Sequence, residues 1–371
     1  MVYAVVTGGG TSGHVVPAMA ILEMLQDAGH PVQDLAYVGS RRGVESTMVP
    51  ALGVRCEFLP ISGLQRSFSP RSLARNLALP ARLLRSTIAA RRLVREWRPR
   101  VVVSVGGYAS EPMARAAVAS GVPLVCVSYD FTPGLATRRQ ARDATVCAVA
   151  FEGSPLPHAV VTGAPVRRSV RSMDVQAERA RVRSTFGVAD DVLFVTFVGG
   201  SLGSAALNEA VHAVVRGMRS DRTGAFVHHI VGPRYSSGAD DTGSTADGVT
   251  VHRVASETDM PGILAASDIV VSRAGASTVA EIAAVGVASV LVPWSGAADD
   301  HQTRNARWLS DAGAAILVDE RNDLQNRLVS AVRMLAADAD RRTAMGAAAR
   351  AQGAPNRSGT LVDVIGNAAL G

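Results

Sequence analysis

The chain contains no lysine, and all 38 of its basic residues are arginine. Its three cysteines, Cys56, Cys126 and Cys147, are scattered and form no C-x-x-C pair. This spacing favours small core residues in a reducing compartment over disulfides or metal ligands. Aromatic residues make up only 4% of the chain and do not interleave with the arginines, so nucleic acid is not an expected partner.

Long apolar runs and a leader peptide are also missing. No apolar run approaches the roughly 20 residues that span a bilayer. The N-terminal VYAVVTGGG reads as a core strand, without a basic leader or a small-residue cleavage site. We therefore expect a soluble, cytoplasmic protein, for which contact with a membrane surface remains open. Its 371 residues, 47% hydrophobic and 19% charged, suffice for two folded domains.

One stretch, residues 267–305, organises the second half of the chain. It reads as a strand at 268–272, a glycine turn, a helix opening near Thr278 and a strand at 288–293. A polar loop follows, which holds Asp299, Asp300, His301, Gln302 and Asn305. This order is half of a nucleotide-binding α/β unit, which binds ligands at the carboxyl ends of its strands.

The same order recurs at the start of each half. The N-terminus gives a strand at 2–6, the turn TGGGTSGH and a helix over about 15–28, with Pro17 in its first turn. The second half restarts with a strand at 192–198, the turn GGSLGS and a helix from Ala205. The alternation of strands and helices between them predicts an α/β protein of two Rossmann-like domains.

We place the N-terminal domain at 1–163 and the C-terminal domain at 164–339. The Ala- and Arg-rich tail predicts a helix over about 340–371 that packs back on the first domain. The most loop-like segment of the chain is 236–248.

Three glycines of the first turn, Gly8, Gly10 and Gly13, satisfy G-x-G-x-x-G, which alone is a weak signal. A dinucleotide fold would need an acidic residue at the end of the second strand, but Arg41 and Arg42 follow that strand here. Because arginines there suit a 2′-phosphate, an NADP-dependent reductase stays open as an alternative.

Residues 64–100 alternate leucines with ten arginines and predict an amphipathic helix, broken near Pro80, with a cationic face. In one interpretation the cationic face is solvated and the leucines pack on a sheet. In the other, the cationic face binds an anionic surface or substrate, such as lipid headgroups or a diphosphate.

Glycines at strand ends let backbone N–H groups approach a phosphate at the start of the next helix. Gly199, Gly200 and Ser201 fit this role, as do Gly275 and Ala276. Arg167, in TGAPVR between the domains, either binds a diphosphate or is a solvated linker charge.

Glu281 has two interpretations. Thr278 and Glu281 have the T-x-x-E spacing of a capping box, which the spacing alone favours. Alternatively, the carboxylate accepts hydrogen bonds from both hydroxyls of a nucleotide ribose. Asp299 or Asp300 would similarly cap the next helix. His14 is either a general base or a hydrogen-bonding residue at the helix start.

Six ordered blocks of the sequence resemble one family. They are GGGTSGHVVPAMAI (8–21), SVGGYAS (104–110), GAPVR (163–167), GGSLGSAALN (199–208), SRAGASTVAEIAAVG (272–286) and AADDHQTRNA (297–306). Together they identify the chain as similar to the MurG-like GT-B glycosyltransferases of family 28, which pass N-acetylglucosamine from UDP to a lipid-linked acceptor.

The resemblance implies two domains facing across a cleft, with the UDP-sugar on the C-terminal domain and the acceptor on the N-terminal one. It implies metal-independent, inverting transfer without a cofactor, by an enzyme at the inner face of the cell membrane that docks through 64–100. His14 would be the base, Arg167 and Ser201 would contact the diphosphate, Glu281 the ribose, and His301 and Gln302 the sugar. The full predicted set adds Gly200, Gly275, Ala276, Ser277 and Thr278 on the donor side, and Thr11, Ser12, Gly13, Tyr108 and Asp130 on the acceptor side.

One block departs from the family. Where relatives carry H-E-Q-N near the acceptor, this chain has Val127, Ser128, Tyr129 and Asp130. We therefore expect the donor chemistry to be kept and a different lipid-linked or specialised-metabolite acceptor, with the peptidoglycan precursor as the alternative. A non-catalytic UDP-sugar binder is a further alternative.

Overall fold

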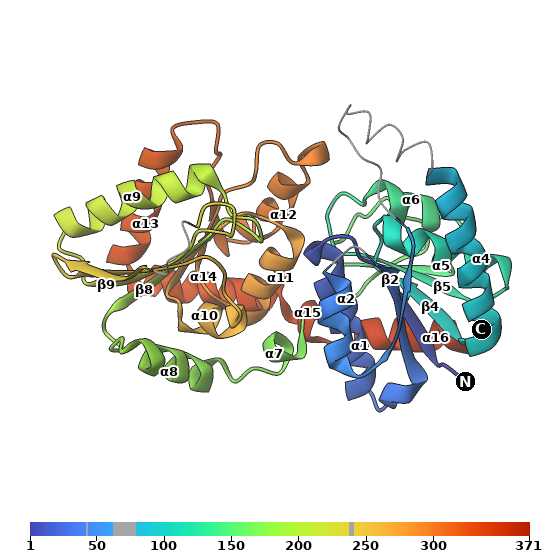
Figure 1. Ribbon diagram of the computed structural model, residues 1–371. Coiled ribbons are helices and arrows are strands. Elements are labelled where there is room, and N and C mark those ends of the chain that lie inside the picture. Colours follow the sequence, from blue (N-terminus) through green and yellow to red (C-terminus); the bar gives the residue numbers. More distant parts are fainter. Residues whose placement is uncertain (42–43, 62–78, 237–240) are drawn as a thin grey trace. The chain divides into compact units, whose positions relative to one another are not determined.

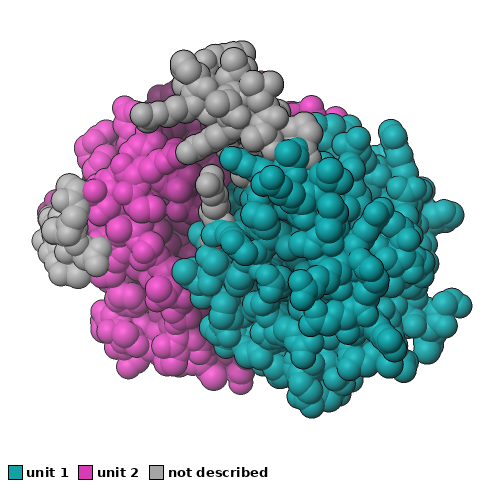
Figure 2. Space-filling model, turned by 45° about the vertical axis from the view of Figure 1, so that its right-hand side comes forward, with its two compact units in different colours: residues 1–168, 355–371 teal, residues 169–354 magenta. Residues whose placement is uncertain are grey.

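The computed structural model describes residues 1–41, 44–61, 79–236 and 241–371 (Figure 1). The chain forms two compact units, coloured separately in Figure 2: unit 1 comprises Met1–Arg168 and Pro355–Gly371, and unit 2 comprises Ser169–Ala354. The observed division therefore follows Arg168, and only the end of the predicted returning tail belongs to unit 1. Arg42 and the first part of the predicted arginine-rich helix, 64–78, lie outside the described residues.

The core of unit 1 is a seven-stranded sheet in the order β3-β2-β1-β4-β5-β6-β7. Each described pairing in it is parallel, and its central strands are apolar and fully buried, as expected of a parallel sheet covered on both faces. The strands are β1 (Ala4–Thr7), β2 (Leu35–Ser40), β3 (Arg55–Leu59), β4 (Val101–Ser104), β5 (Leu124–Ser128), β6 (Val146–Val149) and β7 (Ala159–Val161).

Helices cover both faces of this sheet. Val5 packs with Val94 and Met113, from the helices on one face. Its buried neighbours Ala4 and Val6 point to the other face, because strand side chains alternate. The helices of the unit are α1 (Ser12–Asp27), α2 (Glu45–Met48), α4 (Leu79–Trp97), α5 (Glu111–Ala119), α6 (Leu135–Gln140) and α16 (Thr360–Leu370), with α7 (Arg168–Arg171) and α15 (Ala354–Arg357) at the boundaries.

Unit 2 has a second seven-stranded sheet, in the order β10-β11-β9-β8-β12-β13-β14. Its strands are β8 (Leu193–Val198), β9 (Ala225–Ile230), β10 (Asp241–Ala246), β11 (Val249–Val254), β12 (Ile269–Ser272), β13 (Ser289–Leu291) and β14 (Ala315–Leu317). The prediction of a loop over 236–248 was wrong for its later part, because β10 pairs antiparallel with β11 around Asp247 and Gly248, both of positive φ.

Two apolar clusters lie on the faces of the second sheet. One packs Val195 and Val271 against Val214 and Leu335, and the other packs Phe194 against Val182 and Ile263. The helices are α8 (Val175–Phe186), α9 (Ala205–Ser220), α10 (Met260–Ala266), α11 (Ala276–Val285), α12 (His301–Ser310), α13 (Leu324–Ala337) and α14 (Ala339–Gln352).

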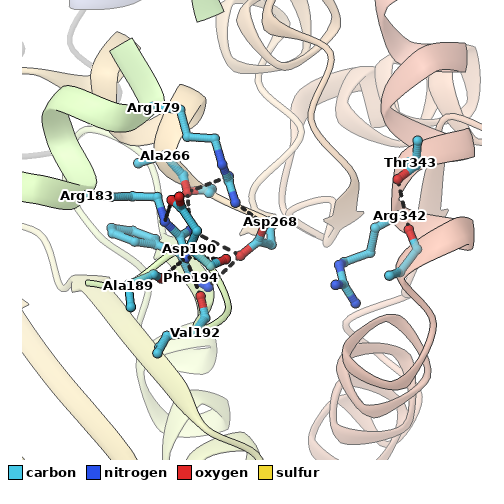
Figure 3. Close-up of polar contacts among 12 residues, drawn as sticks. Arg179, Arg183, Ala189, Asp190, Val192, Phe194, Ala266, Asp268, Arg342 and Thr343 are labelled. Carbon is cyan, nitrogen blue, oxygen red and sulfur yellow. Dashed lines mark hydrogen bonds and ion pairs between the residues drawn. The ribbon is translucent and has the colours of Figure 1, made fainter. Parts of the chain in front are cut away.

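A buried arginine, Arg183, lies at the amino-terminal edge of this sheet. Arg183 of α8 donates to the carbonyls of Ala189 and Ala266 at 2.7 and 3.1 Å and lies 3.3 Å from Asp268 (Figure 3). Asp268 also accepts from Arg179 and from the N–H of Phe194, each at 2.7 Å. These contacts fasten α8 to the starts of β8 and β12 and leave the opposite, carboxyl edge for ligands.

Both sheets have the same switch in strand order, between β1 and β4 in unit 1 and between β8 and β12 in unit 2. Parallel α/β sheets bind ligands at the carboxyl ends of the strands at such a switch. The predicted pair of Rossmann-like domains is therefore confirmed. Within the described ranges, the helices are either too short or too polar to cross a membrane.

Candidate functional site

Three loops of unit 2 lie side by side at the carboxyl edge, because β8, β12 and β13 are neighbours in the sheet. We call them the carboxyl-edge loops: residues 199–204 after β8, 273–275 after β12 and 292–300 after β13. They hold or adjoin the predicted donor-side residues of this unit.

The first loop is a tight glycine turn. Gly200 and Gly203 have φ values of 88° and 82°, a region that favours glycine. A Cβ on Gly203 would lie 2.1 Å from the carbonyl oxygen of Val231. Gly200 is half-buried and Ser201 is exposed, so the turn presents its backbone and the Ser201 hydroxyl at the start of α9, a geometry that suits a phosphate.

The second loop leads into α11, which begins at Ala276 after Gly275 as its N-cap. Thr278 is therefore already inside the first turn, and the predicted capping box with Glu281 is wrong. The N-cap residue Gly275 makes no side-chain cap bond and no acidic residue lies in the first turn, so the N-terminus of this helix suits an anion. Ser277, Thr278 and Glu281 are all partly exposed.

The third loop ends in α12, with Asp300 at the N-cap position but without a side-chain cap bond. His301 Nδ1 lies 2.7 Å from the carbonyl oxygen of Ala298, and Gln302 Oε1 accepts from the N–H of Trp294 at 2.9 Å. Because a carbonyl can only accept, His301 is protonated on Nδ1, and its Nε2 is left for other partners.

Arg273, which sequence reasoning missed, ties these loops together. Its Nη2 donates to Ser204 Oγ at 2.7 Å and to Glu320 Oε1 at 2.5 Å. Its Nη1 donates to the carbonyls of Val292 and Pro293 at 3.2 and 3.3 Å. The guanidinium is nearly buried, and its hydrogen bonds hold the three carboxyl-edge loops together. An arginine directly after a buried strand was the signal in the sequence.

In unit 1 the glycine turn after β1 meets the turn after β4. A Cβ on Gly10 would lie 2.4 Å from the ring of Tyr108, and a Cβ on Gly107 would lie 2.8 Å from the ring of His14. Both glycines have positive φ. The two turns therefore pack backbone against aromatic rings and bring Tyr108 and His14 to the same edge of the sheet.

His14 is engaged by Tyr129, from the end of β5. The Tyr129 hydroxyl oxygen lies 2.5 Å from His14 Nδ1 and 2.7 Å from the carbonyl oxygen of Gly13. Burial lowers the pKa of His14, while the Asp130 carboxylate, the Val105 carbonyl and Glu45 act to raise it. Asp130 thus belongs to the same electrostatic environment.

The first helix, α1, begins earlier than predicted. The helix begins at Ser12, with Thr11 as its N-cap, so Pro17 lies in the helix interior and not in the first turn. Thr11 and Gly13 are exposed, and the side chain of Ser12 is outside the described part of the chain.

Arg167 lies in unit 1, at the end of its first segment. Its Nε and Nη2 donate to Glu23 Oε1 of α1 at 2.9 and 2.7 Å. It is therefore not a bare linker charge.

Apart from Arg167, the predicted residues thus fall into two groups, one at the carboxyl edge of each sheet, and comparison with known proteins identifies both units. Residues 4–149 match the glycosyltransferase family 28 N-terminal domain, and residues 194–359 match the glycosyltransferase family 28 C-terminal domain. The chain belongs to glycosyltransferase family 28. It is thus a glycosyltransferase of the two-domain GT-B class, and the family predicted from the six blocks is confirmed. The reductase alternative has no support.

Named relatives cover nearly the whole chain. A UDP-N-acetylglucosamine–N-acetylmuramyl-(pentapeptide) pyrophosphoryl-undecaprenol N-acetylglucosamine transferase of Desulforudis audaxviator is 36% identical over 97% of both chains. A transferase of the same name from a Nocardioides species is 37% identical over 93% of this chain and 92% of its own. The crystal structure of Acinetobacter baumannii MurG matches with a TM-score of 0.75 and 27% identity, over 99% of this chain and 100% of that one.

Proposed function

We propose that this glycosyltransferase moves N-acetylglucosamine from UDP-N-acetylglucosamine to a polyprenyl-diphosphate-linked acceptor. The observation that carries the proposal is the named activity of the Desulforudis transferase, at 36% identity over 97% of both chains. The donor sugar and the polyprenyl-diphosphate class of the acceptor are taken from the name of this relative.

Unit 2 supplies the donor site in this proposal. The Gly200–Ser201 turn and the start of α11, from Gly275 to Thr278, bind the diphosphate through backbone N–H groups and hydroxyls. The Glu281 carboxylate accepts from the ribose hydroxyls, and His301 Nε2 and the Gln302 amide contact the sugar. Each of these groups adjoins a loop that Arg273 fixes, which preorganises the site.

Unit 1 supplies the acceptor side, with Thr11, Ser12, Gly13, Tyr108 and Asp130 around His14. The acceptor hydroxyl oxygen attacks C1 of the sugar as the C1–oxygen bond to the diphosphate breaks, and UDP leaves with that electron pair. His14 takes the hydroxyl proton as general base. Attack on the face opposite the leaving group inverts the anomeric carbon. The Arg167 guanidinium stabilises the charge on the departing diphosphate, and no metal is assigned a role.

The acceptor is proposed to differ from that of the named relatives. The resemblance implies that Val127–Asp130 replaces an H-E-Q-N motif of related sequences, and this segment supplies Tyr129 to His14. A changed set of side chains beside the base favours a different polyprenyl-linked or specialised-metabolite acceptor. The N-acetylmuramyl-pentapeptide lipid remains the alternative acceptor.

Peripheral membrane association at the inner face of the cell membrane is part of the proposal. On α4, Leu84 and Ile88 have relative exposures of 63% and 56%. A shallow depression beside them is lined by three arginines, two apolar residues and one glutamate: Arg85, Arg92, Arg95, Ile88, Ala89 and Glu96. Exposed apolar side chains among arginines suit an anionic lipid surface.

Calorimetric titration with UDP, UDP-N-acetylglucosamine and NADPH tests the donor assignment. We expect saturable binding of both uridine nucleotides and no binding of NADPH. Binding of NADPH without UDP would contradict the proposal. Donor binding without any UDP release in the presence of polyprenyl-linked acceptors would instead indicate a non-catalytic binder.

A further inference from the structure

Tyr129 lies in the segment Val127–Asp130, where we expect a departure from the family, and its hydroxyl contacts both His14 and Gly13. We infer that Tyr129 is a positioning residue for His14. Its hydroxyl donates to the Gly13 carbonyl, accepts from His14 Nδ1–H, and so leaves Nε2 as the basic nitrogen. This inference rests on the proposed function only for the catalytic role of His14.

The need for a donor at Gly13 comes from the helix itself. In α1 the carbonyl of Gly13 would accept from the N–H of the residue four positions on, which is Pro17. Proline has no N–H, so this carbonyl has no helix partner. Gly13 is itself exposed, and the buried Tyr129 side chain supplies a hydroxyl donor to its carbonyl at 2.7 Å.

Counting protons then fixes the tautomer. A tyrosine hydroxyl has one proton to donate, and burial raises the pKa of Tyr129 well above its ordinary value, so that proton stays in place. Because the Gly13 carbonyl can only accept, the proton lies between these two oxygens. The 2.5 Å contact with His14 therefore needs a proton on Nδ1, with the tyrosine oxygen as acceptor.

The other groups that face His14 are compatible with this assignment. Asp130 and Glu45 lie close enough to raise the pKa of His14, and the Val105 carbonyl favours the protonated ring. When Nε2 takes up a proton, Nδ1–H keeps Tyr129 as its acceptor. Tyr129 meets the His14 ring edge-on, with 6.2 Å between centroids, which fixes the ring plane.

Long-range proton–nitrogen NMR of the ¹⁵N-labelled full chain tests the tautomer without any substrate. In the wild type at a pH above the ring pKa, we expect His14 to be protonated on Nδ1 and unprotonated on Nε2. Tyr129→Phe keeps the buried ring but removes the hydroxyl, so the Nε2–H tautomer should increase and the pKa of His14 should fall.

Pro17→Ala is an independent second variant. It restores a backbone N–H for the Gly13 carbonyl and frees the tyrosine proton for Nδ1, so the Nε2–H tautomer should again increase. Tyr37→Phe is the matched control, because it removes a buried tyrosine hydroxyl that donates to the Gly8 carbonyl of the same turn at 2.8 Å. The His14 signals should not change in this control.

In the transfer assay, Tyr129→Phe should lower kcat about tenfold, less than the roughly 10²–10⁴-fold contribution of a general base itself, with an unchanged KM for the donor. A wild-type ring protonated on Nε2, or unchanged ring signals in Tyr129→Phe, would overturn the inference. Because the NMR measurement needs no turnover, a failure to detect glycosyl transfer would count against the proposed function alone.

Discussion

Glu23 holds Arg167 by two hydrogen bonds to a single carboxylate oxygen, at 2.9 and 2.7 Å. Its other oxygen accepts from the backbone N–H of Arg168 at 2.7 Å. Glu23 is buried, whereas the Arg167 side chain is 27% exposed. The guanidinium is therefore oriented by α1 while part of it remains open, and an anion that binds Arg167 does so beside a fixed carboxylate.

We predict that Arg167→Ala lowers kcat/KM for the donor by about 10- to 100-fold, because a charge-assisted contact to the departing diphosphate is lost. Steady-state kinetics measure this change in kcat/KM. Arg115→Ala is the control, since Arg115 makes a half-exposed pair with Glu111 on α5. Equal effects of both variants, or an unchanged donor KM and kcat for Arg167→Ala, would leave Arg167 only its structural pair with Glu23.

We predict that Glu281→Ala raises the Kd for UDP by about 10- to 100-fold, since each hydrogen bond to a charged group contributes about 1.5–3 kcal/mol. Its melting temperature should stay close to that of the wild type, because Glu281 does not cap α11. Glu209→Ala, an exposed carboxylate on α9, is the control. A lower melting temperature with unchanged UDP affinity would make Glu281 a structural residue.

The start of α11 shows where prediction from sequence stops. Thr278 and Glu281 match a capping box, yet the helix begins at Ala276 after Gly275. Glycine at the N-cap leaves no side-chain signal, whereas the T-x-x-E pattern leaves a strong one. By contrast, the sequence places the end of the second strand directly before Arg41, and β2 (Leu35–Ser40) ends there, because a buried apolar run is a local signal.

Glu320 should make the stability of unit 2 sensitive to acid. Burial acts to raise the pKa of its carboxyl, but hydrogen bonds from Arg273 and from the N–H of Ser295 hold the pKa below its ordinary value. A carboxyl whose pKa is lower in the folded state than in the unfolded state stabilises the fold. This stabilisation is fully present above the unfolded-state pKa of about 4.3, and it is lost as the pH falls through the folded-state pKa.

Melting curves of wild type and Glu320→Gln between pH 3 and pH 7 measure this contribution. The variant should melt lower at neutral pH, and the gap should narrow as the pH falls below about 4.3. Glu209→Gln, which lacks the Arg273 contact, should show no such trend. A gap that is constant across the range would contradict the assigned role of the Arg273–Glu320 pair.

We predict that the chain binds vesicles containing anionic lipid and that binding weakens as salt rises, since the attraction of the arginines is screened. The double variant Leu84→Ser and Ile88→Ser should bind several-fold more weakly, because both apolar side chains are exposed on α4. Met334→Ser, an exposed apolar site on α13 of unit 2, is the control. Vesicle sedimentation that is absent or insensitive to salt would argue against a membrane face on α4.

The contacts that define the candidate site were the least predictable part. Arg167 meets Glu23 across 144 residues, and Tyr129 meets Gly13 across 116. No periodicity or spacing encodes such pairs, which form only when the strand order brings turns to one edge of a sheet. The position of the edge was predictable from the glycine turns, whereas the partners of each side chain were not.

The most direct test of the account is mass spectrometry of the lipid product. The full chain is incubated with UDP-N-acetylglucosamine and polyprenyl-diphosphate acceptors, with and without the N-acetylmuramyl-pentapeptide group. We predict that one acceptor gains the mass of a single N-acetylhexosamine and that Glu281→Ala abolishes most of the product. No mass gain on any polyprenyl-linked acceptor, although UDP-N-acetylglucosamine binds, would contradict the proposed transfer.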